Sequence, residues 1–205
     1  MTEQHDSTKT EQILARVQQG DRASLAQLLT AHRPYMKRIV ELRMEKELQA
    51  RVDPSDIVQE TSLVVSRRID DFLERRPTSF RIWLRRKTLE QIVDARRHHL
   101  AQKRSLRRDY RLSDAPSLAL ARQLLAGRPS QIVRRKESAE QVRSAIDRMS
   151  DNDREILLLR HIEELKNAEV AELLEIDPDT ARKRHGRAVR RLGVLLAKLD
   201  ISVES

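Results

Sequence analysis

Apolar side chains recur at steps of three and four residues along most of this chain of 205 residues. That spacing is typical of helices with one buried face. It is clearest after Asp53-Pro54, where the positions expected on the buried face are Val58, Thr61, Val65, Ile69 and Phe72. No stretch alternates apolar and polar residues over a convincing length, so we expect no β-strands. The pattern predicts an all-α protein.

Capping and breaking residues divide this pattern into separate helices. Side chains of Ser, Thr, Asp and Asn accept hydrogen bonds from the first free amides of a helix. We expect such caps at Thr8 (in a capping box with Glu11), Asp21, Asp53, Thr78 or Ser79, Ser150 and Asn167. We expect Gly20 and Pro77 to end helices. Because proline lacks an amide hydrogen, we expect Pro34 to kink or restart the helix that follows Asp21.

Residues 101–135 differ in composition from the chain on either side. The segment opens with basic residues and then turns to a polar run at 113–117 that contains a proline. We interpret it as a flexible tether with weak structure of its own. The sequence therefore predicts two small helical domains, at 8–100 and 136–200, joined by a linker at 101–135.

The end of the chain predicts two helices separated by a tight turn. A short helix from Asn167 is followed by the turn Glu175-Ile176-Asp177 and by a long basic helix that starts at Pro178. The apolar stripe of the long helix consists of Ala181, Ala188, Leu192, Leu195 and Leu199. Two helices joined in this way are typical of a helix-turn-helix that binds DNA. The same pattern also fits a plain helical hairpin, and the spacing alone leaves both interpretations open.

Basic residues outnumber acidic ones, with 41 Lys and Arg against 32 Asp and Glu, which gives a formal net charge of +9. The excess is concentrated in two stretches. Residues 75–111 hold 13 basic and three acidic residues, and residues 180–199 hold seven basic residues and no acidic one. Two basic stretches in two predicted domains favour two contacts along one polyanion, usually a nucleic acid. The alternative is a basic surface that only faces solvent.

Composition also excludes several classes of protein. The chain has no cysteine, so disulfides, iron–sulfur clusters and thiolate-bound zinc are excluded. Its six histidines are not spaced as metal ligands, and we find no glycine-rich phosphate loop and no nucleophile–base set. We therefore expect no enzyme, no metal site and no cofactor. No apolar run reaches the ~18–20 residues that span a bilayer, and the polar residues 1–10 are unlike a secretory signal, so we expect a cytoplasmic protein without membrane association.

Two groups of residues form motifs that go beyond spacing. The first comprises Asp53-Pro54-Ser55-Asp56-Ile57-Val58-Gln59-Glu60, Phe72, Phe80-Arg81-Ile82-Trp83-Leu84, Asp94 and Arg97. The second comprises Asp153-Arg154-Glu155-Ile156-Leu157, Glu169-Val170-Ala171, Leu174, Ile176, Thr180, Arg184, Arg187-Ala188 and Leu192. They resemble regions two and four of bacterial RNA polymerase sigma factors of the sigma-70 family. The most similar group is the extracytoplasmic-function group, which keeps only these two regions, and the resemblance covers about 11–100 and 136–199.

The resemblance implies a promoter-specificity subunit without catalysis of its own. Region two would dock on the clamp helices of the largest subunit of core RNA polymerase through Asp53, Asp56, Gln59 and Glu60. The basic helix of region two would bind the melted −10 element through Phe80, Trp83, Arg85, Arg86, Glu90 and Arg97. In region four, the helix from Pro178 would enter the major groove at the −35 element through Thr180, Arg182, Lys183, Arg184 and Arg187. The implied partners are core RNA polymerase and promoter DNA, and an anti-sigma factor is a further partner that the family allows.

Three positions depart from the family pattern. Lys87-Thr88 replaces the usual Ile-Ala pair, and Glu175 occupies the place of the turn glycine, which would require a different turn conformation. Glu90 stands where many members carry an Asn thought to engage a flipped base. Its carboxylate would either accept a hydrogen bond from the amino group of a base or form an ion pair within the helix, with Arg86 as the partner. We favour the ion pair.

A second interpretation is a helix-turn-helix regulator whose N-terminal domain senses a signal or dimerises. Such a regulator would not need the acidic Asp56/Gln59/Glu60 helix or the segment from Phe80 to Trp83. Both features favour the sigma factor. The two aromatic side chains of that segment also suit a hydrophobic core, which we favour for Trp83.

Overall fold

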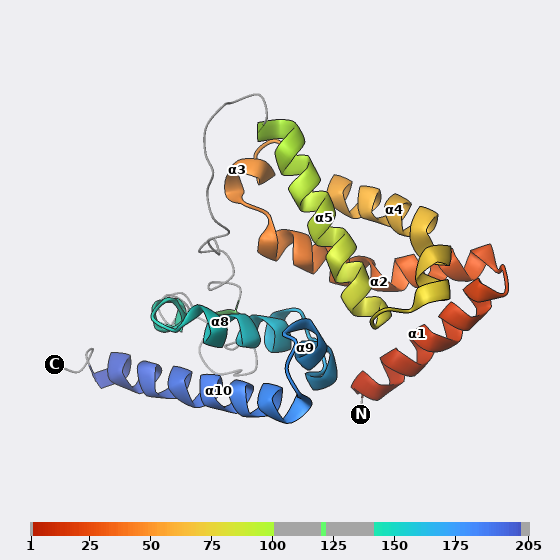
Figure 1. Cartoon of the computed structure of the whole chain (residues 1–205). Helices are drawn as coiled ribbons and strands as arrows, with labels where there is room; N and C mark the ends of the chain where they lie inside the picture. Colours follow the sequence, from red (N-terminus) through yellow and green to blue (C-terminus); the bar gives the residue numbers. More distant parts are fainter. Residues whose placement is uncertain (1, 101–119, 122–141, 202–205) are drawn as a thin grey trace. The chain divides into compact units, whose positions relative to one another are not determined.

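The computed structural model describes residues 2–100, 120–121 and 142–201, and every regular element within them is a helix. The chain divides into two compact units, Met1–Asp109 and Tyr110–Ser205 (Figure 1). The all-α prediction is thus confirmed for the described residues. The predicted linker at 101–135 lies outside them, except for Leu120 and Ala121, which are helical and fully buried.

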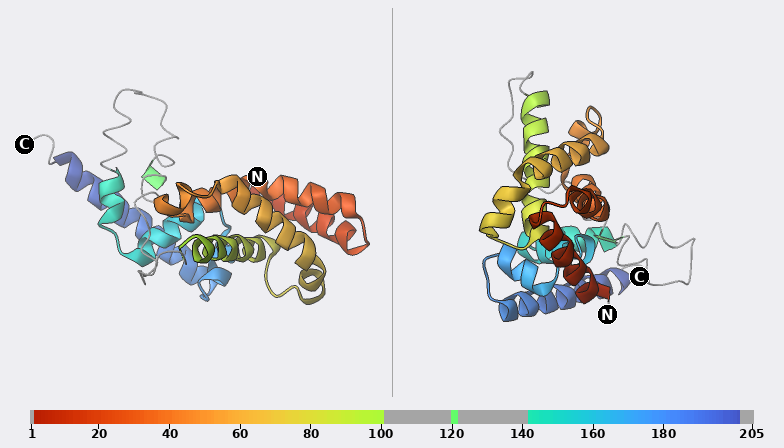
Figure 2. Two further views of the ribbon diagram at one scale, coloured as in Figure 1. Left: turned by 90° about the horizontal axis from the view of Figure 1, so that it is seen from above. Right: turned by 90° about the vertical axis from the view of Figure 1, so that its right-hand side faces the viewer.

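Five helices make up the described part of the N-terminal unit: α1 (Thr2–Gln18), α2 (Arg22–Arg43), the short α3 (Lys46–Gln49), α4 (Pro54–Arg75) and α5 (Phe80–Leu100). Helix α2 is central, since it packs against α1, α4 and α5, and α4 also packs along α5 (Figure 2). All five positions predicted to be buried on α4, from Val58 to Phe72, are buried. The period of apolar residues therefore identified the correct face of this helix.

Three aromatic rings close the core between α4 and α5. Phe72 on α4 stacks on Trp83 of α5, with 4.7 Å between the ring centroids. Phe80 meets Phe72 edge-on at 5.7 Å. Such contacts contribute about 0.5–1.5 kcal/mol each beyond the burial of area. Because Trp83 is only 8% exposed, the core role favoured for it is confirmed. Phe80, at 2%, is buried in the same core.

Most of the predicted helix boundaries are confirmed. Three predicted caps accept a hydrogen bond from an amide in the first turn of the next helix: Asp21, Asp53 and Ser150. The Ser79 hydroxyl accepts one from the amide of Ile82 at the start of α5. Gly20 has a positive φ of 90°, as expected for a residue that ends a helix. Helix α4 ends before Pro77.

Two predicted boundaries are wrong, and of the two outcomes expected at Pro34 the restart does not occur. Thr8 lies inside α1, because no proline or glycine between residues 2 and 7 stops the helix from starting earlier. Helix α2 continues through Pro34 without a restart, since buried residues on both sides hold it on the core and offset one missing amide hydrogen bond. Asn167 is the first residue of α9 and not its cap. The chain enters α9 at Lys166, whose amide donates to the Glu169 carboxylate at 2.7 Å.

The described part of the C-terminal unit contains helical residues 142–147, α8 (Asp151–Leu157), the π-helical turn η1 (Leu158–Ile162), α9 (Asn167–Leu173) and the long α10 (Pro178–Ile201). Helix α8 runs directly into η1, and α10 packs against α8 and α9. The Arg154 guanidinium donates to three backbone carbonyls, those of Ile146, Asp147 and Met149. A helix leaves such carbonyls unpaired at its C-terminal end, so Arg154 fixes α8 to the preceding helix.

The turn between α9 and α10 contains a residue in the left-handed conformation. Glu175 has a φ of 53°, which glycine adopts freely but which costs a residue with a Cβ about 1–2 kcal/mol. Its amide donates to the Glu172 carbonyl, and the amide of Ile176 donates to the Ala171 carbonyl at 3.0 Å. These two bonds close the end of α9 and require the left-handed backbone. The expectation of a different turn conformation at Glu175 is therefore wrong.

We expect Glu175→Gly to stabilise the C-terminal unit by roughly 0.5–1 kcal/mol, because relief of the left-handed strain exceeds the entropy that glycine adds to the unfolded chain. Urea unfolding followed by far-UV circular dichroism measures the change. Glu172→Gly is the matched control, since Glu172 is exposed within α9, and it should destabilise the unit by about 1 kcal/mol. Destabilisation by Glu175→Gly would show that this turn is not strained.

Candidate nucleic-acid interface

Hydrogen bonds from both sides of the turn hold the start of α10. The Asp177 carboxylate accepts from the amide of Thr180 at 2.8 Å and also from the Thr180 hydroxyl. The bond from the hydroxyl is the main reason, and the amide bond the second, that the pKa of Asp177 lies below its ordinary value. From α9, the Asn167 side-chain amide donates to the Pro178 carbonyl at 2.8 Å. The first turns of α9 and α10 are thereby fixed to each other, as a helix-turn-helix requires.

Helix α10 turns small apolar residues toward the core. The predicted stripe is confirmed at Ala181, Ala188 and Leu192, which are buried, while Leu195 is half-buried. The side chain of Leu199 lies outside the described part of the chain. Because alanine adds little bulk, α10 can lie close to α8 and α9 along this stripe. The charged side chains of α10 are left to its outer face.

The outer face of α10 forms a shallow groove of about 400 Å³. It is lined by Thr180, Arg182, Lys183, Gly186, Arg187 and Arg190. Arg182 pairs with Asp179 at 2.5 Å. Within the described residues, Lys183, Arg187 and Arg190 form no ion pair. The groove therefore presents cations without a neutralising carboxylate, which is the chemistry that attracts phosphates.

The groove gathers most of the residues predicted to contact the −35 element. Four of the five line it, namely Thr180, Arg182, Lys183 and Arg187. The fifth, Arg184, is half-buried and does not line it. Sequence reasoning missed Gly186 and Arg190, although helical spacing could have found Arg190, which follows Arg187 by three positions on the same face. Contact of these residues with DNA stays a prediction.

Helix α4 exposes an acidic and polar face near its start. Asp56, Gln59 and Glu60 are exposed there. Sequence reasoning missed Leu63, which follows on the same face and is 44% exposed, because apolar periodicity assigns a leucine to the core by default. Asp53 instead caps α4 by accepting from a first-turn amide at 2.7 Å, and this bond is the main cause of the lowered pKa of Asp53.

The residues predicted to bind the −10 element divide between core and surface. The buried ones are Phe80, Trp83 and Arg85. The exposed ones are Arg86, Glu90 and Arg97. In this conformation neither aromatic ring offers a free face on which a base could stack. A basic groove with accessible aromatic rings, as predicted for region two, is therefore not formed by these side chains.

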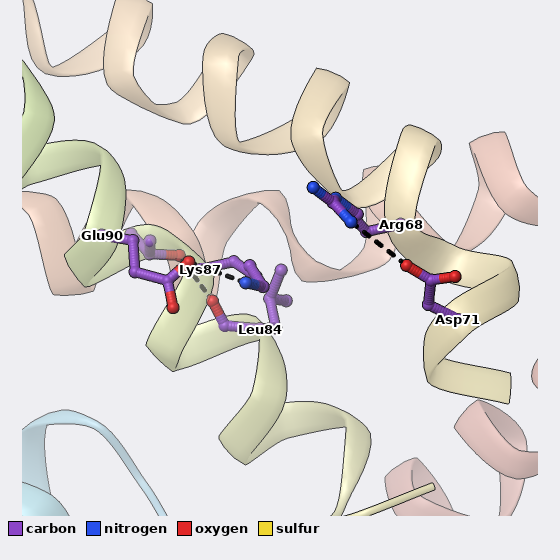
Figure 3. Close-up of polar contacts among 6 residues, drawn as sticks. Arg68, Asp71, Leu84, Lys87 and Glu90 are labelled. Atoms are coloured by element: carbon purple, nitrogen blue, oxygen red, sulfur yellow. Dashed lines mark hydrogen bonds and ion pairs between the residues drawn. The ribbon is translucent and has the colours of Figure 1, made fainter. Parts of the chain in front are cut away.

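Glu90 forms an ion pair with Lys87, with 2.7 Å between the carboxylate and Nζ (Figure 3). The predicted partner Arg86 is wrong, although both positions lie one turn before Glu90. The Lys87 side chain is 21% exposed and that of Glu90 44%, so the pair is partly shielded from water. The neighbouring Thr88 is buried and donates its hydroxyl to the Leu84 carbonyl at 2.9 Å. The unusual Lys87-Thr88 pair thus has structural contacts of its own.

Two further observations concern the part of the chain that the structure describes. There, no three His, Asp or Glu side chains gather as they would around a metal ion. None of the helices in that part has the length and apolar character needed to cross a membrane.

Comparison with known proteins matches the C-terminal unit to a family. Residues 139–192 match the model for sigma-70, region 4. This range contains α8, η1, α9 and the part of α10 that lines the groove. Among solved structures, the chain is similar to CnrH in its complex with the cytosolic domain of CnrY, with 21% sequence identity and a TM-score of 0.51. The match covers 91% of this chain and 96% of that chain, and it shows a shared fold. No curated protein matches the chain.

We expect Arg187→Ala to weaken binding to double-stranded DNA and to lower the slope of log K against log salt by about 1, because each phosphate contact releases counterions. Fluorescence anisotropy with a labelled duplex at several salt concentrations measures the slope. Arg191→Ala is the matched control, since it removes the same charge one turn later, where Arg191 pairs with Asp153 of α8. Equal losses of slope in the two variants would contradict a contact at the groove.

Proposed function

We propose that this protein is a sigma factor of the sigma-70 family, which binds core RNA polymerase and directs promoter-specific initiation of transcription. The observation that carries the proposal is the match of residues 139–192 to sigma-70 region 4. It falls on a helix-turn-helix whose long helix exposes a groove of cations. The finer assignment, to the extracytoplasmic-function group, rests on the resemblance of residues 53–60 and 80–84 to region two.

In this proposal α10 enters the major groove at the −35 element. Lys183, Arg187 and Arg190 provide the contacts to phosphates and base edges, since an arginine fork fits both a phosphate and the O6/N7 edge of guanine. The Thr180 hydroxyl is engaged by Asp177, so Thr180 first positions the start of the helix.

The outer face of α4 is the proposed docking site for the clamp helices of the largest polymerase subunit. Asp56 and Glu60 would steer the encounter with a basic surface. Leu63 would lie at the centre of this interface, where an apolar side chain is removed from water on binding. This arrangement supports polymerase binding more strongly than the carboxylates alone.

Phe80 and Trp83 are buried in this conformation, so a base of the −10 element cannot stack on either ring. The exposed Arg86 and Arg97 supply positive charge for the displaced strand. Capture of an unstacked base is then assigned to the end of α4 and the loop after it, residues 74–79, or to a rearrangement of α5 on binding. The loop joins α4 to α5 and includes Arg76, which has a positive φ of 36°.

A protein partner besides the polymerase is part of the proposal. The similar protein CnrH forms a complex with the cytosolic domain of CnrY. We propose by analogy that this chain also binds a cytosolic domain that regulates it, in the role of an anti-sigma factor.

A helix-turn-helix regulator that acts outside the polymerase is the second candidate, because the α10 groove alone would suit it. Transcription by core polymerase on a promoter library, with and without this protein, distinguishes the two. A sigma factor makes the core enzyme start at specific promoters. A regulator binds DNA without the core enzyme and does not confer initiation on it.

We expect Asp56→Arg to weaken binding to core polymerase several-fold, because reversal of a rim charge slows association with a basic surface. Titration of the core enzyme with the labelled full chain measures the affinity. Asp71→Arg makes the same charge change near the other end of α4, where Asp71 pairs with Arg68 at 3.3 Å, and it should have a smaller effect. Leu63→Ser should also weaken binding. Wild-type affinity in both Asp56→Arg and Leu63→Ser would remove the docking role of this face.

We expect Glu90→Gln to leave the base preference at every −10 position unchanged, with normal or improved affinity for DNA. The reason is that Lys87 already engages the Glu90 carboxylate, so the substitution removes an ion pair and a negative charge near phosphates. Initiation scored over all four bases at each −10 position measures the preference. A changed preference at one position would show instead that Glu90 accepts a hydrogen bond from the amino group of a base.

A further inference from the structure

Two histidines from different elements of the C-terminal unit meet each other. The Nε2 atoms of His161 on η1 and His185 on α10 are 3.0 Å apart, although the residues are 24 positions apart in sequence. Both side chains are half-buried. In the sequence of α10, the proposed DNA contacts Lys183 and Arg187 lie on either side of His185, although His185 itself does not line the groove.

The π-helical turn is what presents His161 to α10. Leu158, Leu159 and Ile162 of η1 are buried, which leaves His161 at the edge of the core. A π-helical turn inserted in an α-helix is rare and is frequent at functional sites. Here it continues directly from α8, so the position of His161 is tied to that helix.

The rings meet head-on, as a hydrogen-bonded pair does. Their centroids are 5.1 Å apart, against 3.0 Å between the Nε2 atoms, so the two nitrogens lie nearly between the two rings. The geometry therefore favours one shared proton, with one imidazole as donor and the other as acceptor.

Positive charge surrounds the pair. The Arg160 guanidinium, fixed by its bond to the Leu165 carbonyl, acts on both histidines. Among the nearby carboxylates, Asp153 pairs with Arg191, Asp151 pairs with Arg154, and Glu169 accepts from the Lys166 amide. Glu155, Glu163 and Glu164 also have contacts. Near His185, α10 carries Arg182, Lys183, Arg184 and Arg187. Arg160 therefore disfavours a second proton on the pair.

We propose that the His161–His185 contact is a pH-sensitive latch that joins η1 to α10 and opens when both imidazoles are protonated. When both imidazoles are neutral, one donates its N–H to the bare nitrogen of the other. When one imidazole becomes protonated, the other, still neutral, continues to accept this hydrogen bond. Only when both rings carry two protons does the acceptor disappear, and two cations then face each other beside Arg160. The proposal does not depend on the proposed function, because it concerns the fold of this unit.

The direction of the pH effect follows from the environment of each ring. Burial is the main cause that lowers the pKa of both histidines, and Arg160 lowers both further. The unfolded chain binds these protons more readily, at the ordinary histidine value of about 6.5. The stabilisation that comes from keeping these two histidines neutral is therefore fully present above about pH 6.5 and is lost progressively as the pH falls below that value.

Urea unfolding of the full chain tests the latch, because two signals separate the units. Trp83 is the one tryptophan in the sequence and lies in the N-terminal unit, so its fluorescence reports that unit, whereas far-UV circular dichroism reports both. Between about pH 7.5 and about pH 5.5, on either side of the ordinary histidine pKa, we expect the midpoint of the C-terminal transition to fall more than that of the Trp83 signal.

Matched variants assign this shift to the pair. In His161→Gln/His185→Gln, the amides can still bond but do not titrate, so the extra shift should disappear. His98→Gln, at an exposed position on α5, should keep it. A wild-type shift in the double variant would overturn the proposal. If the double variant does not fold, proton NMR titration of the wild type decides: apparent pKa values below about 6.5 for His161 and His185 support the latch, and ordinary values overturn it.

Discussion

Helix α10 has to bury a stripe of small apolar residues while it carries seven cations between residues 180 and 199, and the C-terminal unit is organised around this constraint. Ala181 and Ala188 let α10 lie close to α8 and α9, and most of its charged side chains are exposed. In water, like charges repel by only about 1 kcal/mol at 4 Å. Asp153 and Asp179 neutralise the cations at the edges, and the unpaired cations that remain form the groove.

In the N-terminal unit, the basic helix α5 buries large aromatic side chains, whereas the basic helix α10 buries small ones. The stack of Phe72 on Trp83, with Phe80 edge-on, fixes α5 against α4 and takes both rings of α5 out of solvent. Packing, rather than charge, therefore decides which α5 residues are available to a ligand. The same contact leaves the outer face of α4 exposed, with Leu63 among its polar residues.

Local features of the fold could be predicted from the sequence, and features that depend on tertiary contacts could not. The cap at Asp53 and the buried face of α4 follow from residue types and period within one helix. The unbroken course of α2 through Pro34 depends on packing at both of its ends. Apolar period does not tell a core leucine from the exposed Leu63. The pair of His161 and His185 joins two elements whose mutual position no local pattern encodes.

A chain with only four glycines has to end helices with other residues in the left-handed conformation. Arg76, Glu164 and Glu175 take this role after α4, η1 and α9, with φ values of 36°, 52° and 53°. All three are charged and exposed, so their side chains stay in water while hydrogen bonds impose the backbone. At Arg76, the amide donates to the Phe72 carbonyl at 2.7 Å, and the guanidinium pairs with Glu11 of α1 at 2.9 Å. The strained residue thereby also joins two helices, which a glycine could not do.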